Sequence, residues 1–264
     1  MEYTLKDYQE DAVKDVLKQL TKAKKHWKED KDIQTFSLTA TTGAGKTVMA
    51  AAVFEALFYG NDDYDFEADR GAVVLWFSDD PSLNEQSRHE LERASDKLGG
   101  NLVTISNNFD KEKLEPGHVY FLNTQKLSAK STLLQSGTDK RQYSFWDILR
   151  NTIDDRNLTT YLLLDEAHRG MKEDKSRPTI VKKLINGNGV VPAIPIVLGI
   201  SATVERFNKA MEGTENRTKL PNIVVDTEKV QAEGLLKDTL ILDIPDDGTT
   251  SVDTVLLRRA IDKF

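Results

Sequence analysis

Short apolar runs alternate along the chain with longer segments in which apolar residues recur at a spacing of about four. An uninterrupted apolar run is typical of a strand buried on both faces of a parallel sheet, whereas the wider spacing is typical of a helix with one buried side. On this basis we expect strands at residues 36–39, 72–77, 102–105, 118–122, 160–164, 194–200, 223–225 and 239–244. We expect helices at residues 5–27, 46–59, 79–98, 144–153, 178–185, 227–235 and 251–264, with polar loops at 61–70 and 128–143.

The alternation of strands and helices predicts an α/β fold, a three-layer sandwich with a mainly parallel central sheet. Connections in such a sheet are right-handed, so the loops that follow the strands gather at one edge, where ligands bind. A length of 264 residues is at the upper end for one domain and also allows two small ones. The residues directly after the strands are therefore the first place to look for function.

The composition restricts the classes of protein. Hydrophobic residues make up 39% of the chain and charged residues 30%, which is typical of a soluble globular protein. No apolar run approaches the roughly 18–20 residues of a membrane span, so no membrane partner is expected. The chain has no cysteine, which excludes disulfides, thiolate catalysis and cysteine-bearing zinc sites and favours a cytoplasmic location. A net charge of −7 argues against a surface covered in positive charge, but it leaves room for a local basic groove.

A glycine-rich turn lies between the predicted strand at 36–39 and the predicted helix at 46–59. The pattern G-x-x-x-x-G-K-[ST] is met from Gly45 onward, with Ala40 in place of the first glycine. Such a loop lays backbone N–H groups against phosphate oxygens, and the helix N-terminus adds its dipole. A loop that carries its lysine by chance is the alternative. We expect this loop to bind the phosphates of ATP through Thr42, Gly43, Ala44, Gly45, Lys46 and Thr47.

Within this loop two side chains have specific expected roles. Lys46 is predicted to reach the β- and γ-phosphates and to assist catalysis, and the Thr47 hydroxyl is predicted to bind Mg²⁺. An acidic pair, Asp165 and Glu166, directly follows the apolar run at 160–164. A carboxylate at that strand end can hold Mg²⁺ opposite Thr47, so Asp165 is the predicted metal ligand. Glu166 is then placed to accept the proton of the attacking water. An acidic pair that caps the next helix is the alternative.

Together these motifs resemble the first RecA-like lobe of a superfamily 2 DEAD/DEAH-box helicase. The resemblance rests on ATTGAGKT at residues 40–47, DEAH at 165–168, SAT at 201–203 and LKDYQ at 5–9. The order of motifs looks most like the ATP-dependent translocase subunit of type III restriction enzymes and related defence helicases. The resemblance implies a P-loop NTPase fold with ATP and Mg²⁺ as cofactors and nucleic acid as partner.

The resemblance also implies roles for single residues. Gln9 would read the adenine edge, and Tyr8 would pack nearby or face the core. Ser201 and Thr203 would couple the nucleotide state to the nucleic-acid surface, and His168 would bridge to a second lobe or be an ordinary structural histidine. In related motors the corresponding loops touch the nucleic-acid backbone, which suggests as contacts Ser78, Asn84, Gln86, Thr124, Gln125 and Lys126.

We therefore expect residues 1–245 to form the ATP-binding lobe and 246–264 to begin a connection to a second lobe that this chain does not contain. No Q-x-x-G-R-x-G-R-like segment, which would carry the arginine finger, follows Thr203, so the isolated chain is expected to hydrolyse ATP barely above background. The expected activity is ATP hydrolysis coupled to nucleic acid, with duplex DNA favoured and a DNA-modification or other defence subunit as a further partner. The alternatives are an RNA-dependent DEAD/DEAH-box ATPase and a P-loop protein that uses ATP as a switch without translocation.

Overall fold

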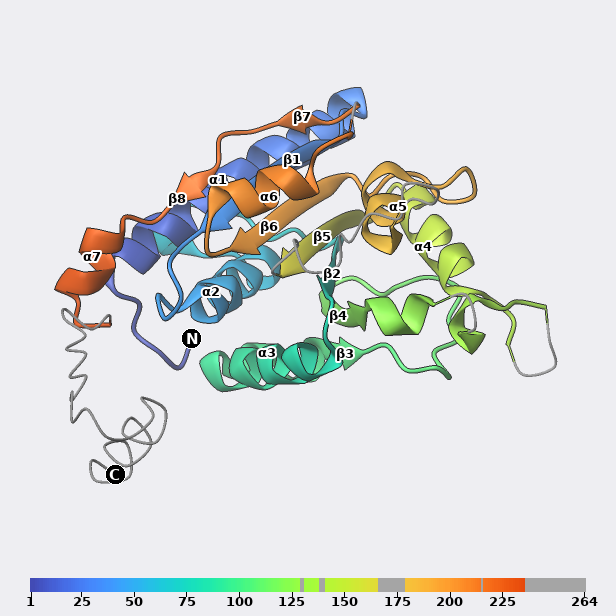
Figure 1. Cartoon of the computed structure of the whole chain (residues 1–264), viewed down its shortest axis with the longest axis horizontal. Helices are drawn as coiled ribbons and strands as arrows, with labels where there is room; N and C mark the ends of the chain where they lie inside the picture. The colour runs from blue at the N-terminus through green and yellow to red at the C-terminus, as the bar shows by residue number, and fades with distance from the viewer. Residues whose placement is uncertain (129–130, 138–140, 166–178, 215, 236–264) are drawn as a thin grey trace, which may run out of the picture.

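The computed structural model describes residues 1–128, 131–137, 141–165, 179–214 and 216–235 (Figure 1). Their centre is a parallel sheet of eight strands in the order β3-β4-β2-β5-β6-β1-β7, with β8 also paired to β1. The strands are β1 (Gln34–Thr39), β2 (Ala72–Ser78), β3 (Leu102–Thr104), β4 (His118–Asn123), β5 (Thr159–Asp165), β6 (Ile196–Ser201), β7 (Thr218–Lys219) and β8 (Ile223–Val224). All strand pairs are parallel, so the carboxyl ends of all the strands lie at one edge.

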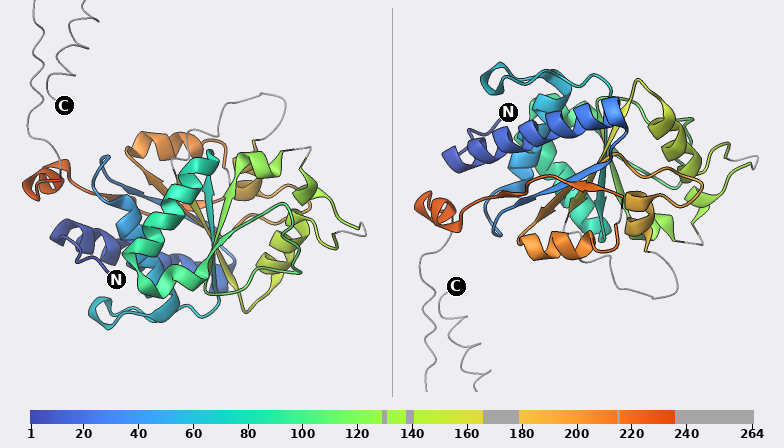
Figure 2. Two further views of the ribbon diagram at one scale, coloured as in Figure 1. Left: turned by 90° about the horizontal axis from the view of Figure 1, so that it is seen from below. Right: turned by 90° about the horizontal axis from the view of Figure 1, so that it is seen from above.

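Helices cover both faces of this sheet (Figure 2). The α-helices are α1 (Asp7–Asp30), α2 (Lys46–Tyr59), α3 (Pro81–Ala94), α4 (Phe145–Asp154), α5 (Ile180–Asn186), α6 (Val204–Ala210) and α7 (Thr227–Ala232). Short 3-10 helices lie at η1 (Asp62–Tyr64), η2 (Asp96–Asn101), η3 (Thr124–Leu127) and η4 (Thr132–Leu134). No helix among the described residues combines the length and the apolar character needed to cross a membrane.

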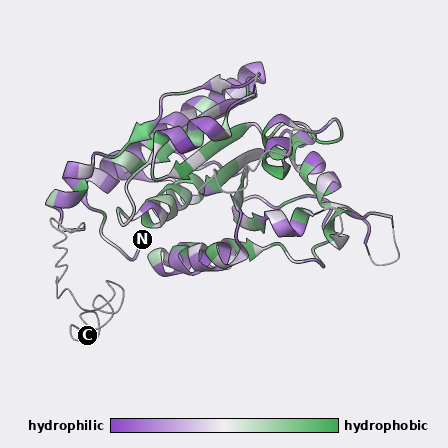
Figure 3. Ribbon diagram, in the orientation of Figure 1, coloured by the Kyte–Doolittle hydropathy of each residue, from purple (hydrophilic) through white to green (hydrophobic). Residues whose placement is uncertain are grey.

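The core consists of two apolar layers, one on each side of the sheet. Buried side chains of α1, α2 and α3 form the first layer with one face of the strands. Those of α4, α5 and α6 form the second with the opposite face. Because successive residues of a strand point to opposite faces, strands buried on both sides are rich in apolar residues, as the green colouring of the middle of the sheet in Figure 3 shows. The predicted three-layer α/β sandwich with a mainly parallel sheet is confirmed.

Several element bounds differ from the sequence prediction. The helix expected at 79–98 ends at Ala94, because the C-cap Ser95 is extended and a separate 3-10 helix that contains Gly99 and Gly100 follows. The seven-residue α6 and the two-residue β7 were not predicted, since such short elements contain too few residues to show a period. The region expected as the loop 128–143 contains η4. The strand at 239–244, the helix at 251–264 and the domain boundary at 245 lie outside the described residues.

The edge of the sheet beside β1 is fixed by two polar side chains. Between β7 and β8 the ladder is interrupted, and Asn222 Oδ1 accepts the Ser37 N–H at 2.9 Å in its place. Just before β7, Arg217 is buried with 7% of its surface exposed. Its guanidinium donates to four backbone carbonyls, with N···O distances of 2.8 Å to Gln34, 3.1 Å to Pro195 and 2.6 Å to both Ile185 and Ile194. Arg217 therefore joins α5, the segment before β6, and β1.

Candidate nucleotide-binding site

The loop between β1 and α2, predicted to bind phosphate, turns at two glycines. Gly43 and Gly45 adopt φ values of 88° and 77°, in the left-handed region that favours glycine. A Cβ added at Gly45 would also collide with Gln9 Nε2 unless the Gln9 side chain moved. Because β1 ends at Thr39 and α2 begins at Lys46, the loop opens directly onto the N-terminus of a buried helix.

The Lys46 side chain lies against the loop that precedes it. Its Nζ donates to the carbonyls of Ala40 at 2.9 Å and Thr41 at 3.2 Å. The loop residues Thr42 and Gly43 are exposed, while Lys46 and Thr47 are partly buried in the first turn of α2. The positively charged Lys46 side chain is therefore held beside the turn that it is predicted to serve.

The start of α1 holds the same loop from the other side. The Tyr8 hydroxyl donates to the Ala44 carbonyl at 2.9 Å, and Gln9 Nε2 donates to the same oxygen at 3.0 Å. Gln9 Oε1 accepts the Lys6 N–H at 3.0 Å, which also fixes the first turn of α1. The residue predicted to read adenine is thus in contact with the predicted phosphate loop.

Asp165 lies level with this loop at the same edge of the sheet. The β6 partners of Thr39 and Asp165 are the consecutive residues Ser201 and Ile200, so β1 and β5 end within one residue of each other. With β6 between them and strands about 4.8 Å apart, the two ends are separated by about 10 Å.

The direction of the Asp165 side chain follows from the alternation along β5. Tyr161 and Leu163 pack in the layer of α1, α2 and α3, whereas Leu162 and Leu164 pack in the opposite layer. Asp165 therefore points to the side of α2, the helix that carries Lys46 and Thr47. Ser87 of α3 confirms this direction, because its Oγ lies 3.4 Å from Asp165 Oδ2.

The segment 201–203 contacts the start of the loop between β1 and α2 through a backbone hydrogen bond. The Ser201 carbonyl accepts the Ala40 N–H at 3.2 Å, and the buried Ser201 hydroxyl donates to the Thr203 carbonyl. Thr203 is exposed and is the N-cap residue of α6. The α6 helix packs closely on β6, since a Cβ at Gly199 would collide with the Phe207 ring. Ser201 thus links the start of the phosphate loop to α6.

Glu166 and His168 lie outside the described residues, so their predicted roles stay predictions.

Two of the six residues predicted to contact nucleic acid are buried. Ser78 and Asn84 are 1% and 2% exposed. Ser78 Oγ lies 2.8 Å from Asn84 Oδ1 and 3.0 Å from the Asp80 carbonyl and donates within this group. The structure therefore places both side chains inside the turn between β2 and α3, which they support, and not at the surface that the prediction requires.

The other four residues are at least partly accessible. Gln86 and Gln125 are exposed, and Gln86 Nε2 donates to Glu90 at 2.9 Å. Thr124 Oγ1 donates to Asp79 Oδ1 at 2.8 Å, which joins the turns after β4 and β2. Lys126 Nζ donates to Asn107 Oδ1 at 3.2 Å. These side chains stay candidates for contact with a nucleic-acid backbone.

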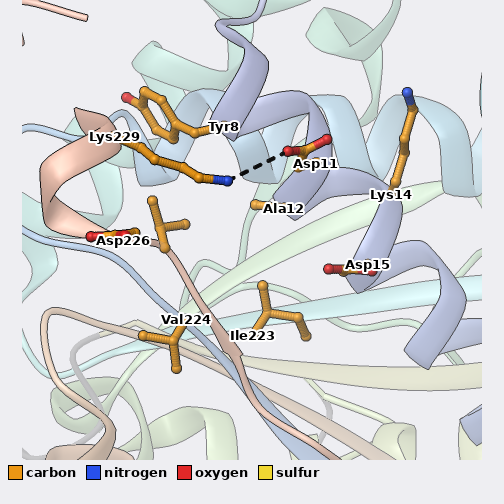
Figure 4. A pocket seen from close by; sticks show the side chains of 10 residues that line it. Tyr8, Asp11, Ala12, Lys14, Asp15, Ile223, Val224, Asp226 and Lys229 are labelled. Carbon is orange, nitrogen blue, oxygen red and sulfur yellow. Dashed lines mark ion pairs between the residues drawn. The ribbon is translucent and has the colours of Figure 1, made fainter. Parts of the chain in front are cut away.

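A groove of about 340 Å³ lies beside α1 (Figure 4). Its two walls are α1 and the segment that runs from β8 into α7, and Lys229 Nζ and Asp11 Oδ2 are 4.0 Å apart across it. The residues that line it are Tyr8, Asp11, Ala12, Lys14, Asp15, Ile223, Val224, Val225, Asp226 and Lys229. Tyr8 therefore separates this groove from the phosphate loop, none of whose residues from 42 to 47 lines it.

Sequence reasoning missed three features of the site. Ser87 contacts Asp165 across 78 positions of sequence, and no local pattern marks such a contact. The bond between Thr124 and Asp79 also joins separate strand ends. The Ala44 carbonyl, as a backbone acceptor, has no sequence signal at all.

Solved structures of three proteins are similar to the chain. They are a nuclease-deletion mutant of the type ISP restriction-modification enzyme LlaGI in complex with a DNA substrate mimic (14% identity, TM-score 0.46), a variant of S. cerevisiae Dbp5 bound to RNA and ADP BeF3 (14%, 0.43), and the DUF1998 helicase MrfA bound to DNA (16%, 0.46). The matches cover 88%, 86% and 85% of this chain but 21%, 51% and 28% of those proteins, so the chain spans about half of their length or less. At these identities and scores the likenesses carry no conclusion about function.

Among curated proteins no relative matches the chain. A comparison with protein families matches residues 2–206 to the family described as type III restriction enzyme, res subunit. This span contains the phosphate loop, Asp165 and the segment 201–203, the motifs that predicted the relationship. The chain belongs to this family of type III restriction enzyme res subunits.

Proposed function

We propose that the chain is the ATP-binding motor lobe of a nucleic-acid-dependent ATPase. The observation that carries the proposal is the placement of the phosphate loop and Asp165 at level strand ends, on the same side of the sheet. A loop of this conformation binds phosphate, and a carboxylate beside it holds the accompanying cation. Membership of the res-subunit family supports the same assignment.

The residues present suit Mg²⁺·ATP. Thr47 offers a hydroxyl and Asp165 a carboxylate, and oxygen ligands of this kind are those that Mg²⁺ prefers. Their positions, in the first turn of α2 and at the end of β5 on the α2 side, make them the residues that would hold it. When bound, the ion neutralises charge on the β- and γ-phosphates.

Three side chains of the site would have separate roles in binding and hydrolysis. Lys46 would exchange its bonds to the Ala40 and Thr41 carbonyls for phosphate oxygens, which bind a cation more strongly than a neutral carbonyl does. Gln9 would bind the adenine edge while staying bonded to Ala44, since its amide has a second N–H and a second lone pair. Glu166 would accept the proton of the attacking water.

We further propose that duplex DNA is the nucleic acid and that a second RecA-like lobe supplies the arginine finger. Membership of the family of type III restriction enzyme res subunits favours DNA over RNA. The alternative is an RNA-dependent ATPase. A modification or other defence subunit would be an additional partner of the whole protein.

The test is ATP hydrolysis by the protein with its second lobe present, alone and with either duplex DNA or single-stranded RNA. We expect duplex DNA to raise the steady-state rate at least several-fold and RNA to leave it near the basal value. Stimulation by RNA alone would replace DNA with RNA as the partner. Equal rates in all three conditions, with ATP bound, would indicate a nucleotide switch and contradict the proposed motor.

A further inference from the structure

Two side chains of α1 donate to one backbone oxygen of the phosphate loop. The Tyr8 hydroxyl and Gln9 Nε2 lie 2.9 Å and 3.0 Å from the Ala44 carbonyl. All three residues are buried, with exposures of 4% for Tyr8, 6% for Gln9 and 0% for Ala44. A carbonyl with two buried donors is held in one orientation, because turning it would leave both donors unpaired.

The orientation of this carbonyl determines where the next N–H points. In a trans peptide the C=O and the N–H of the same unit point in opposite directions. The Ala44 carbonyl points toward α1, so the Gly45 N–H points away from α1. Both residues that flank Ala44 are glycines in the left-handed region. Without the two hydrogen bonds to the Ala44 carbonyl, the backbone at these glycines could rotate at little cost.

We propose that Tyr8 is a positioning residue of the phosphate loop, which holds the peptide between Ala44 and Gly45 so that the Gly45 N–H faces the bound phosphates. This inference rests on the proposed function, because it assigns the bound group as the phosphates of a nucleotide. It adds a role for Tyr8 that is separate from base recognition.

A second donor is useful because Gln9 has more than one task. Its amide oxygen already accepts the Lys6 N–H. Its second N–H and its second oxygen lone pair are those assigned to adenine. Tyr8 has a single hydroxyl proton, which it donates to the Ala44 carbonyl of the loop. Burial raises the pKa of Tyr8 above its ordinary value, so at neutral pH the hydroxyl keeps the proton that it donates.

The experiment compares Tyr8→Phe with the parent chain for binding of Mg·ATP, Mg·ADP and adenosine by calorimetry. The variant keeps the buried ring and removes one hydrogen bond to the loop. We expect the Kd for ATP and ADP to rise about 3–10-fold, the effect of one net hydrogen bond, with the Kd for adenosine unchanged. Tyr59→Phe is the matched control. Tyr59 is the last residue of α2, at the end away from the loop, and its hydroxyl donates to the Lys97 carbonyl. This control variant should bind ATP, ADP and adenosine as the parent chain does.

Gln9→Glu serves as a second variant, because a carboxylate cannot donate to Ala44 but can still accept from Lys6. It should weaken adenosine as well as ATP, in contrast to Tyr8→Phe. Equal ATP affinity of Tyr8→Phe and the parent would overturn the inference, and so would an equal loss for ATP and adenosine. If the parent chain binds no ATP, the proposed function fails instead, and the two failures are thus distinguishable.

Discussion

Glu166→Gln is expected to slow ATP hydrolysis by about 10²–10⁴-fold while Mg·ATP still binds with near-parent affinity. The substitution keeps the size of the side chain and removes its ability to accept the proton of the attacking water. Binding depends instead on the phosphate loop and the cation, which the substitution does not alter. The measurement is single-turnover hydrolysis with the second lobe and duplex DNA present, together with a binding titration.

Asp165→Asn is the comparison that separates the two carboxylates. A neutral amide is a poor ligand for Mg²⁺, so this variant should bind ATP with an affinity that depends little on magnesium. Hydrolysis by Glu166→Gln at the parent rate would mean that another residue is the base. Loss of ATP binding in Glu166→Gln would contradict the division of roles between Asp165 and Glu166.

Arg217→Met is expected to lower the free energy of unfolding by about 3 kcal/mol or more. The substitution removes the donors to four buried backbone carbonyls and leaves these oxygens without that bond. Removal of a buried charge offsets part of this loss. Burial lowers the pKa of Arg217 to about 10, so the group is charged at neutral pH and the bonds that methionine removes are charge-assisted.

Urea unfolding of the 264-residue chain measures this loss, with Arg93→Met as the control because Arg93 is exposed on α3. If Arg217→Met does not fold, Arg217→Lys, which retains the charge with fewer donors, should still fold with an intermediate loss. Stability of either Arg217 variant equal to that of Arg93→Met would show that the four hydrogen bonds contribute nothing net.

The parts of the fold and site that sequence predicts are those with a local pattern. β2 is buried along its whole length and is apolar up to Ser78, and residues 161–164 of β5 are buried and bulky, so both runs can be recognised without a structure. The phosphate loop requires glycine for its backbone and lysine for its charge within a few consecutive residues. The parallel order of the strands then brings Asp165 to the same edge, because the carboxyl ends of parallel strands lie at one edge of the sheet.

The parts that sequence does not predict depend on contacts between distant residues. Arg217 lies in a polar stretch typical of an exposed loop, and its burial follows from four carbonyls contributed by three other segments. Ser78 and Asn84 look like surface donors because polar side chains usually are exposed, yet they satisfy each other inside a turn. Tyr8 fits the apolar face of α1 equally well whether or not its hydroxyl has a partner.

The most direct test of the nucleotide site is a calorimetric titration of Mg·ATP into the chain and into Lys46→Ala. Lys25→Ala, an exposed lysine of α1, is the control for loss of a positive charge. If residues 42–47 bind the phosphates, Lys46→Ala should weaken binding by about 1.5–3 kcal/mol and Lys25→Ala should leave it unchanged. Equal affinity of Lys46→Ala and the parent chain, with both folded, would contradict the assignment of this loop as the nucleotide site.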